Sequence, residues 1–270
     1  MAQNCAVPPS TTVRILRWIA VVVMLGGAAG CGIAGTPHPV STTPPASPGG
    51  PMTLAGWKLT LPVAGRKGDA ATLDPAAVSP PWLVADGSGG FTLWAPVAGV
   101  TTPHSDHPRT ELDSLSPFLA GVGRHVLTAE VTVAKLPKAE PDVILGQIHG
   151  ADAISSVPFV MLHDDNGKIG VVVKQQQSGP SGVTVPLLTG VPLGTRFAYS
   201  ISDDGNGTLT FTATADGRTA TGTAAVPAPF NGAPVRFQAG DYQQAEAEAE
   251  GGAATDDGAR VTFHALGVGP

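Results

Sequence analysis

The sequence predicts an all-β fold, a sandwich of antiparallel sheets with a concave groove on its solvated side. Short segments alternate apolar and polar residues, as residues 57–61 and 91–97 do, and this period of two is that of a half-buried strand. Gly, Asn, Asp and Pro separate the segments, and helical periodicity is almost absent. About a dozen short strands joined by such turns are typical of a β-sandwich. Its solvated polar face suits a chain molecule.

The first predicted strand covers residues 57–61 and ends at Pro62, because proline has no N–H for the sheet ladder. A short helix is expected within residues 74–84, since Pro75 after Asp74 fits a first helical turn. Three further strands are predicted in this half of the chain, at residues 107–112, 126–133 and 143–149.

A hairpin across residues 157–173 is the clearest local signal in the second half. Its two apolar segments flank Asn166-Gly167, a pair that accepts the positive φ angles of a tight reversal. A loop is expected over residues 245–258. The remaining predicted strands cover residues 197–202, 208–214, 219–226, 236–244 and 260–266.

The front of the chain, residues 1–31, has the features of a signal peptide ending in a lipoprotein box. Arg14 and Arg17 precede an apolar run, and small residues then lead to Cys31. The run is shorter than the ~20 apolar residues of a comfortable transmembrane span. A lipoprotein box usually carries Leu three places before its Cys, whereas this chain has Ala28, so ordinary secretion stays open as the alternative. We expect an extracytoplasmic protein attached to the membrane only through a lipid on Cys31.

Residues 32–51 read as a tether and residues 52–270 as one folded domain. The tether is rich in Pro, Ser, Thr and Gly and has no apolar periodicity, so it cannot form a core. The two cysteines, Cys5 and Cys31, both precede the domain, which excludes a disulfide framework or a thiolate metal site within it.

The predicted domain is acidic. Without residues 1–30, which contain two Arg and no acid, 13 basic and 21 acidic residues remain, a net charge of −8. This charge argues against a nucleic-acid partner. An anionic substrate would therefore need positive charge concentrated locally at its site.

Polar side chains gather on one face of three predicted strands. Because side chains alternate along a strand, Arg109 shares a face with Glu111, and Gln147 shares one with His149. Gln238, Tyr242 and Gln244 do the same near the C-terminus, with Gly240 leaving a gap where a ligand could approach the backbone. We expect these faces to meet in one groove.

The three segments resemble the signature blocks of polysaccharide lyase family seven, the alginate lyases. The blocks are Arg-(Ser/Thr)-Glu-Leu-Arg, Gln-(Ile/Val)-His and Tyr-Phe-Lys-Ala-Gly-x-Tyr-x-Gln, and this chain has Arg-Thr-Glu-Leu-Asp from Arg109, Gln-Ile-His from Gln147, and Arg-Phe-Gln-Ala-Gly-Asp-Tyr-Gln-Gln from Arg236. Residues 57–62 and 261–266 resemble the opening and closing strands of the family. The resemblance implies a jelly roll and a secreted lyase that cuts a polyuronate by β-elimination.

The resemblance also implies roles for four catalytic residues. Arg109 and Gln147 would neutralise the sugar carboxylate, His149 would remove the C5 proton, and Tyr242 would protonate the leaving O4. In the family this Tyr can also act as the base when the proton lies on the same side. No metal or organic cofactor is needed, and the partner is an anionic polysaccharide such as alginate. We expect the protein to act as a monomer.

Five further residues are expected to bind substrate, and some depart from the family pattern. Asp113 and Gln238 replace a family Arg and Lys, so two cations that help to hold a polyanion are absent. Arg236 replaces a Tyr and restores at most one cation. The sequence does not decide which face of the strand its side chain lies on. The Ile of Gln-Ile-His is associated with guluronate, while glucuronate or a less charged polyuronide stays possible. The predicted substrate-binding residues are Glu111, Gln238, Gln244, Arg236 and Lys174.

Two other functions compete with the lyase. One is a non-catalytic carbohydrate-binding sandwich, a relative of the lyases in which Asp113 and Gln238 have weakened substrate binding. The other is a glycoside hydrolase of similar fold that uses Glu111 and a second acid. Two further clusters are interpreted as loops: His104, Asp106 and His107, whose spacing resembles metal ligands, and Glu246, Glu248 and Glu250, which alternate like paired carboxylates.

Overall fold

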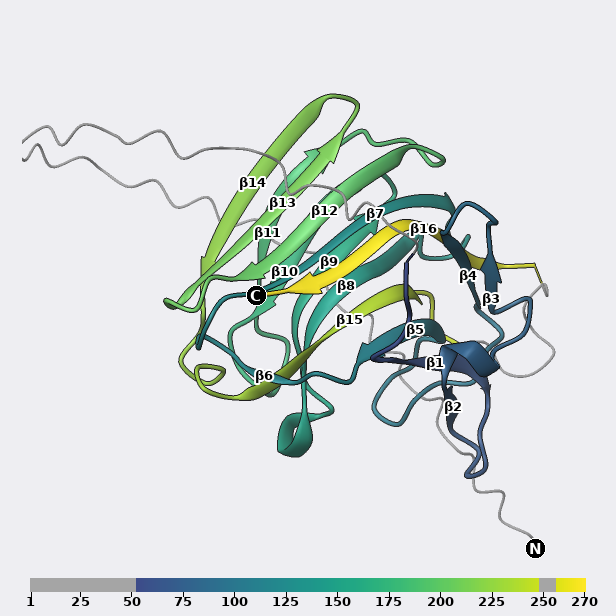
Figure 1. Ribbon diagram of the computed structural model, residues 1–270, viewed down its shortest axis with the longest axis horizontal. Coiled ribbons are helices and arrows are strands. Elements are labelled where there is room, and N and C mark those ends of the chain that lie inside the picture. Colours follow the sequence, from purple (N-terminus) through teal and green to yellow (C-terminus); the bar gives the residue numbers. More distant parts are fainter. Residues whose placement is uncertain (1–51, 248–255) are drawn as a thin grey trace, which may run out of the picture. The chain divides into compact units, whose positions relative to one another are not determined.

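The computed structural model describes residues 52–247 and 256–270, and these form a two-sheet β-sandwich. The predicted signal peptide, Cys31 and the predicted tether lie outside the described residues, as do Glu248 and Glu250. All pairings between neighbouring strands are antiparallel, as the alternation predicts. The all-β prediction is therefore confirmed. The two sheets and their order are visible in Figure 1.

The sheet that carries the predicted polar strands has nine strands among the described residues. Its spatial order is β11-β10-β9-β8-β15-β5-β1-β2, with β6 paired to β15. Strands far apart in the sequence thus become neighbours, because β15 lies between β8 and β5 (Figure 1). The strands are β1 (Trp57–Ala64), β2 (Ala70–Leu73), β5 (Arg109–Ser114), β6 (Phe118–Leu119), β8 (Asp142–Gly150), β9 (Pro158–Asp165), β10 (Lys168–Lys174), β11 (Gly182–Thr189) and β15 (Pro234–Gln243).

The second sheet has seven strands in the order β14-β13-β12-β7-β16-β4-β3. Its centre pairs β16, the last strand of the chain, with β7 over most of its length. The strands are β3 (Leu83–Ala85), β4 (Phe91–Pro96), β7 (His125–Lys135), β12 (Arg196–Asp203), β13 (Thr208–Ala215), β14 (Arg218–Ala225) and β16 (Gly258–Gly269).

The hydrophobic core fills the space between the sheets. Alternate residues of each strand point into it, so Leu59 and Leu112 are fully buried while the residues on either side of Leu59 face outward or the groove. Among the fully buried side chains are five phenylalanines and Tyr199. This packing leaves the outer face of the nine-stranded sheet free for polar side chains.

The predicted strands are all present, and the structure corrects one strand boundary and two helical segments. β1 continues through Pro62 to Ala64, because the strand bulges after Leu61 and no longer pairs with β5 there. The expected helix is a single 3-10 turn, η1 (Pro75–Ala77), capped by Asp74. A second turn, η2 (Asp152–Ile154), was not predicted.

Four strands were missed, namely β2, β3, β6 and β11. Three of them have four residues or fewer, too short to show a period. β11 contains Pro186, which argues against a strand but is tolerated at a sheet edge, where β11 lies. The predicted hairpin is correct, and Asn166 and Gly167 have φ angles of 48° and 84°.

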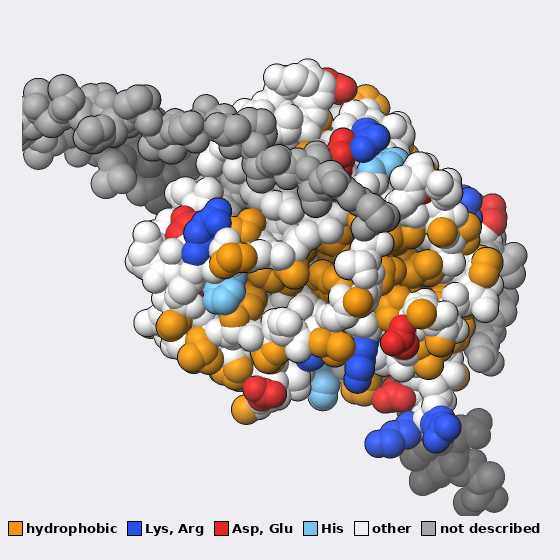
Figure 2. Space-filling view, in the orientation of Figure 1, with side chains coloured by type: hydrophobic (Ala, Val, Ile, Leu, Met, Phe, Trp, Pro, Cys, Tyr) orange, Lys and Arg blue, Asp and Glu red, His pale blue; other side chains and the backbone are white. Residues whose placement is uncertain are grey.

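No helix among residues 52–247 and 256–270 is long and apolar enough to cross a membrane. In the space-filling view, charged side chains of both signs are scattered over the visible face, and two cationic side chains lie side by side at its lower right edge (Figure 2).

Candidate active site

A groove of about 730 Å³ opens on the outer face of the nine-stranded sheet. Strands β1, β5, β8 and β15 form its floor, and the loops around His104 and Ser155 form walls. All four predicted catalytic residues line this groove: Arg109, Gln147, His149 and Tyr242. The expectation that the three polar strand faces meet is therefore correct.

Strand register sets which of these side chains are neighbours. Along β15, Arg236 lies opposite His149, Gln238 lies between Gln147 and Asp113, and Tyr242 lies opposite Arg109. Arg236, Gln238 and Tyr242 of β15 thus face the groove. This settles the face of Arg236, which the sequence left open.

A local irregularity in β8 places Gln147 and His149. The pairing of β8 with β9 shifts after Ile144, so Leu145 and Gly146 both face inward. The Tyr199 phenol of the opposite sheet occupies the space above Gly146 and donates a hydrogen bond to the Leu145 carbonyl at 2.7 Å. A Cβ on Gly146 would meet that hydroxyl at 2.8 Å, so glycine is required here. Beyond this point alternation resumes and Gln147 faces the groove.

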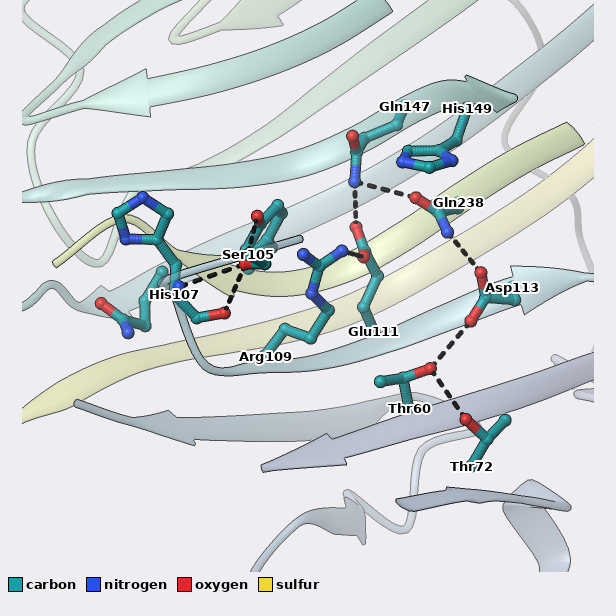
Figure 3. A network of polar contacts seen from close by, with 12 residues as sticks. Thr60, Thr72, Ser105, His107, Arg109, Glu111, Asp113, Gln147, His149 and Gln238 are labelled. Carbon is teal, nitrogen blue, oxygen red and sulfur yellow. Dashed lines mark hydrogen bonds and ion pairs between the residues drawn. The ribbon is translucent and has the colours of Figure 1, made fainter. Parts of the chain in front are cut away.

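Glu111 forms the buried centre of the site. Its side chain has no exposure, and its carboxylate accepts from Arg109 Nη1 at 2.9 Å and from Gln147 Nε2 at 2.6 Å (Figure 3). Burial raises the pKa of Glu111 to about 6, although the nearby Arg109 guanidinium opposes the rise. Because both oxygens are engaged by protein groups, Glu111 holds two neighbours in place, and its contact with substrate stays a prediction.

Arg109 and Tyr242 form a stacked pair. The guanidinium carbon lies 3.5 Å from the centre of the phenol ring, and Ser105 Oγ lies 3.0 Å from the phenol oxygen. Burial raises the pKa of Tyr242 above its ordinary value, while Arg109 and Ser105 act to lower it. The phenol is therefore protonated at neutral pH and can donate a proton.

His149 is a neutral imidazole in this site. The pKa of His149 is lowered to about 4, chiefly by burial and also by the positive charges of Arg109 and Arg236, while the hydrogen bond to Gly150 and the charge of Asp113 act to raise it. His149 Nδ1 lies 3.2 Å from the Gly150 carbonyl. A carbonyl only accepts, so Nδ1 carries the hydrogen and Nε2 keeps a free lone pair.

Gln147 lies between two acceptors. Its Nε2 donates to Glu111 and also to Gln238 Oε1 at 3.0 Å, so both amide hydrogens are used within the protein. Its Oε1 is buried without a hydrogen-bond partner. We expected this amide to donate to the sugar carboxylate, whereas in this arrangement it holds two protein groups.

The two departures from the family pattern contact each other. Gln238 Nε2 donates to Asp113 Oδ1, and Thr60 Oγ1 donates to Asp113 Oδ2 at 3.0 Å (Figure 3). A polar chain therefore runs from β1 through β5 and β15 to β8. The sequence analysis treated both positions as lost cations, with Gln238 also expected to bind substrate, and did not predict their contact.

Gly240 has a different purpose from the one predicted. A Cβ at this position would lie 2.6 Å from Glu111 Cα and 2.7 Å from the Thr110 carbonyl oxygen. The missing side chain thus makes room for the backbone of β5, which lies against it, and leaves no gap for a ligand. This close approach brings Glu111 beneath the groove.

The structure divides the remaining predicted substrate-binding residues. Gln238, Gln244 and Arg236 line the groove with Glu111, whereas Lys174 does not. Lys174 ends β10, two strands beyond β8, so its distance from the groove follows from the strand order. Within the described residues Arg236 forms no ion pair, and its Nε is buried without a partner.

Sequence reasoning missed Ser105, Thr60 and Lys58, which also line the groove. No periodic signal marks Ser105, because it reaches Tyr242 from an irregular loop 137 residues earlier in the chain. Across residues 52–247 and 256–270 there is no group of three or more His, Cys, Asp or Glu that could hold a metal ion. Glu246 is exposed, as a solvated loop predicts.

A β-sandwich whose groove is lined by Arg, Gln, His and Tyr defines the class of the protein as a polysaccharide lyase of the jelly-roll type. The model of the alginate lyase family matches residues 52–270. The chain belongs to that family. A search of curated proteins found no match.

Solved structures of alginate lyases have the same fold. Alginate lyase A1-II′, a member of polysaccharide lyase family seven, is 25% identical with a TM-score of 0.66, covering 80% of this chain and 95% of that one. An alginate lyase from Pseudomonas aeruginosa is 24% identical with a TM-score of 0.69, covering 81% of this chain and 99% of that one. A variant of A1-II′ in complex with substrate is 24% identical with a TM-score of 0.65, covering 84% and 97%.

Proposed function

We propose that this polysaccharide lyase cleaves alginate or a related polyuronate by β-elimination, with His149 as the base and Tyr242 as the acid. The observation that carries the proposal is a neutral imidazole with a free Nε2 in the same groove as a protonated phenol and a buried guanidinium. These are the groups that a proton abstraction beside a carboxylate needs.

Neutralising the sugar carboxylate is the first requirement, because an ionised carboxylate leaves the C5 proton too weakly acidic to remove. Arg109 supplies the positive charge, and the Glu111 carboxylate and Tyr242 ring hold its guanidinium in place. A donor fixed before the reaction stabilises developing enolate-like charge without reorganising during the step. Gln147 completes the site by donating to Glu111, which keeps that carboxylate in place against Arg109.

The elimination moves one proton at each end of the broken bond. His149 Nε2 takes the C5 proton, the C5–H electrons form a C4=C5 double bond, and the C4–O4 bond breaks. Tyr242 gives its proton to O4, so the two products are an unsaturated sugar and a free hydroxyl, without water. The low pKa of His149 keeps it unprotonated, and therefore able to act as a base, at neutral pH.

The polymer is anionic in this proposal. Lys58, Arg109 and Arg236 bring three cations to the groove against the two acids Glu111 and Asp113. One solved complex of alginate lyase A1-II′ contains a substrate written GGMG, and another contains a product written GGG. Membership of the same family supports alginate as the first polymer to test.

The test incubates the purified domain, residues 52–270, with alginate, polyguluronate, polymannuronate and glucuronan. Elimination gives ultraviolet absorbance from the conjugated double bond, hydrolysis gives reducing ends without that absorbance, and a binding module gives neither. His149→Ala and Tyr242→Phe should each lower kcat by about 10²–10⁴-fold with an unchanged circular dichroism spectrum. Full activity in both variants would remove the assigned roles.

We also infer that the protein is exported and attached by a lipid on Cys31, with residues 32–51 as a tether and one chain as the working unit. The leader pattern and the Pro-, Ser-, Thr- and Gly-rich composition support this. Expression with labelled palmitate should label the wild-type chain and not Cys31→Ser. Labelling of both chains, or of neither, would contradict an anchor at Cys31, and sedimentation of the domain tests the monomer.

A further inference from the structure

We propose that Asp113 and Gln238 are positioning residues that fix the orientation of the Gln147 amide, in place of the two cations that the family pattern has there. The inference rests on the proposed function, because it concerns the same groove. It assigns to Asp113 and Gln238 a role in turnover, which kcat measures. A loss of substrate binding would instead change KM.

The argument starts from the polarity of Asp113. An ionised carboxylate only accepts hydrogen bonds, so Thr60 and Gln238 must both act as donors toward it. Gln238 must therefore present its Nε2 to Asp113, and its Oε1 then faces β8. That oxygen in turn requires a donor from Gln147.

The second acceptor is Glu111, which lies on the other side of the same amide nitrogen. Gln147 Nε2 is 2.6 Å from Glu111 Oε1 and 3.0 Å from Gln238 Oε1. Reversing the amide would bring its carbonyl oxygen against two acceptor oxygens at once, in a fully buried position. One orientation is therefore strongly favoured, and it leaves Gln147 Oε1 as the unpaired atom of the network.

The consequence is a fixed Gln147 amide beside the base. Gln147 and His149 lie on the same strand face, two residues apart, and both line the groove (Figure 3). The amide nitrogen stays on Glu111 Oε1, and the other oxygen of Glu111 holds Arg109 in place. Asp113 and Gln238 thus act through Gln147 without touching the reacting atoms.

The experiment measures kcat and KM on the best polyuronate for Asp113→Ala, Asp113→Asn and Gln238→Ala. Loss of orientation should lower kcat about tenfold or more in the two Ala variants, with less than a threefold change in KM. Asp113→Asn keeps an acceptor oxygen and should recover most of kcat. If Asp113 acts only by repelling a polyanion, both of its variants will lower KM and leave kcat unchanged, which overturns the inference.

A double-mutant cycle isolates the path through Gln147. In a Gln147→Ala background, Gln238→Ala should cause no further loss of kcat, because its target is gone. Independent, multiplying losses would overturn the inference while leaving the lyase assignment intact. A wild-type protein without ultraviolet product on any polyuronate would instead overturn the proposed function.

Thr60 offers a matched test at the far end of the network. Thr60→Val removes one donor to Asp113 and should lower kcat two- to fivefold. The control is Thr92→Val, which removes a similar hydroxyl contact, 2.8 Å to Thr262, in the opposite sheet. Equal effects of the two substitutions would count against the network.

Discussion

Replacing Glu111 by Gln tests the buried centre of the site through stability. The carboxyl pKa rises from 4.5 to about 6 on folding, because burial disfavours the charge. Below pH 4.5 the group is protonated in both states, and as pH rises past 6 the folded state must carry a buried charge. At ~1.36 kcal/mol per pKa unit, ionisation therefore removes about 2 kcal/mol from the free energy of unfolding between pH 4 and pH 7.5.

Glu111→Gln has no such charge, so its unfolding free energy relative to wild type should improve by about 2 kcal/mol over that pH range. Urea unfolding at pH 4 and pH 7.5 measures the difference in unfolding free energy between the variant and wild type. The contributions of other titrating groups cancel in this difference. The variant should also lose about tenfold or more in kcat at pH 7.5, since Arg109 loses its charged partner. A pH-independent difference between the two proteins would refute the raised pKa.

Asp164 gives a matched control for this experiment. It is also buried with a pKa raised to about 6, but it lies at the β9–β10 turn, where it accepts from the Gly167 N–H at 2.7 Å. Asp164→Asn should likewise flatten the pH dependence of stability while leaving kcat unchanged. Comparing Glu111→Gln with Asp164→Asn separates an effect on stability from an effect on catalysis in the groove.

Three further substitutions follow from the same geometry. Ser105→Ala removes a hydrogen bond that lowers the pKa of the neighbouring phenol, so kcat should fall about three- to tenfold and any basic limb of the rate profile should move to higher pH. Arg236→Gln should raise KM and move the acid limb upward, because this cation lowers the pKa of His149; an unchanged limb would contradict that influence. Gly240→Ala should cost roughly 1–3 kcal/mol of stability in urea unfolding. Gly269→Ala, with open space around its Cβ, should be neutral.

Alternation along strands is a local property, which is why the fold and much of the groove could be predicted. Arg109 with Glu111, and Gln147 with His149, share faces because each pair is two residues apart in an extended segment. The Asn166-Gly167 turn is likewise decided by its own two residues. The family resemblance supplied the remaining step, that three distant segments meet.

The parts that failed depend on contacts between segments. Whether Gly240 serves a ligand or a neighbouring strand is decided by where β5 lies, and nothing in residues 236–244 carries that information. The bond from Ser105 to Tyr242 needs the path of an irregular loop. Lys174 was expected in the groove because it ends a strand, but the strand order puts it two strands away.

Local charges in the groove explain how an acidic domain can act on a polyanion. Charges elsewhere on the domain are screened over ~8 Å at physiological salt, so the side chains that line the groove determine its electrostatic potential. There the charge of Arg109 is balanced by Glu111 at 2.9 Å, and Lys58 lies across the strand pair from Asp113. Among the described residues that line the groove, neither Lys58 nor Arg236 forms an ion pair, and Arg236 has no acid opposite it on the neighbouring strands. Binding of the polymer therefore depends most on Arg236, while the Arg109–Glu111 pair, held neutral overall, is suited to stabilising charge that appears only during the reaction.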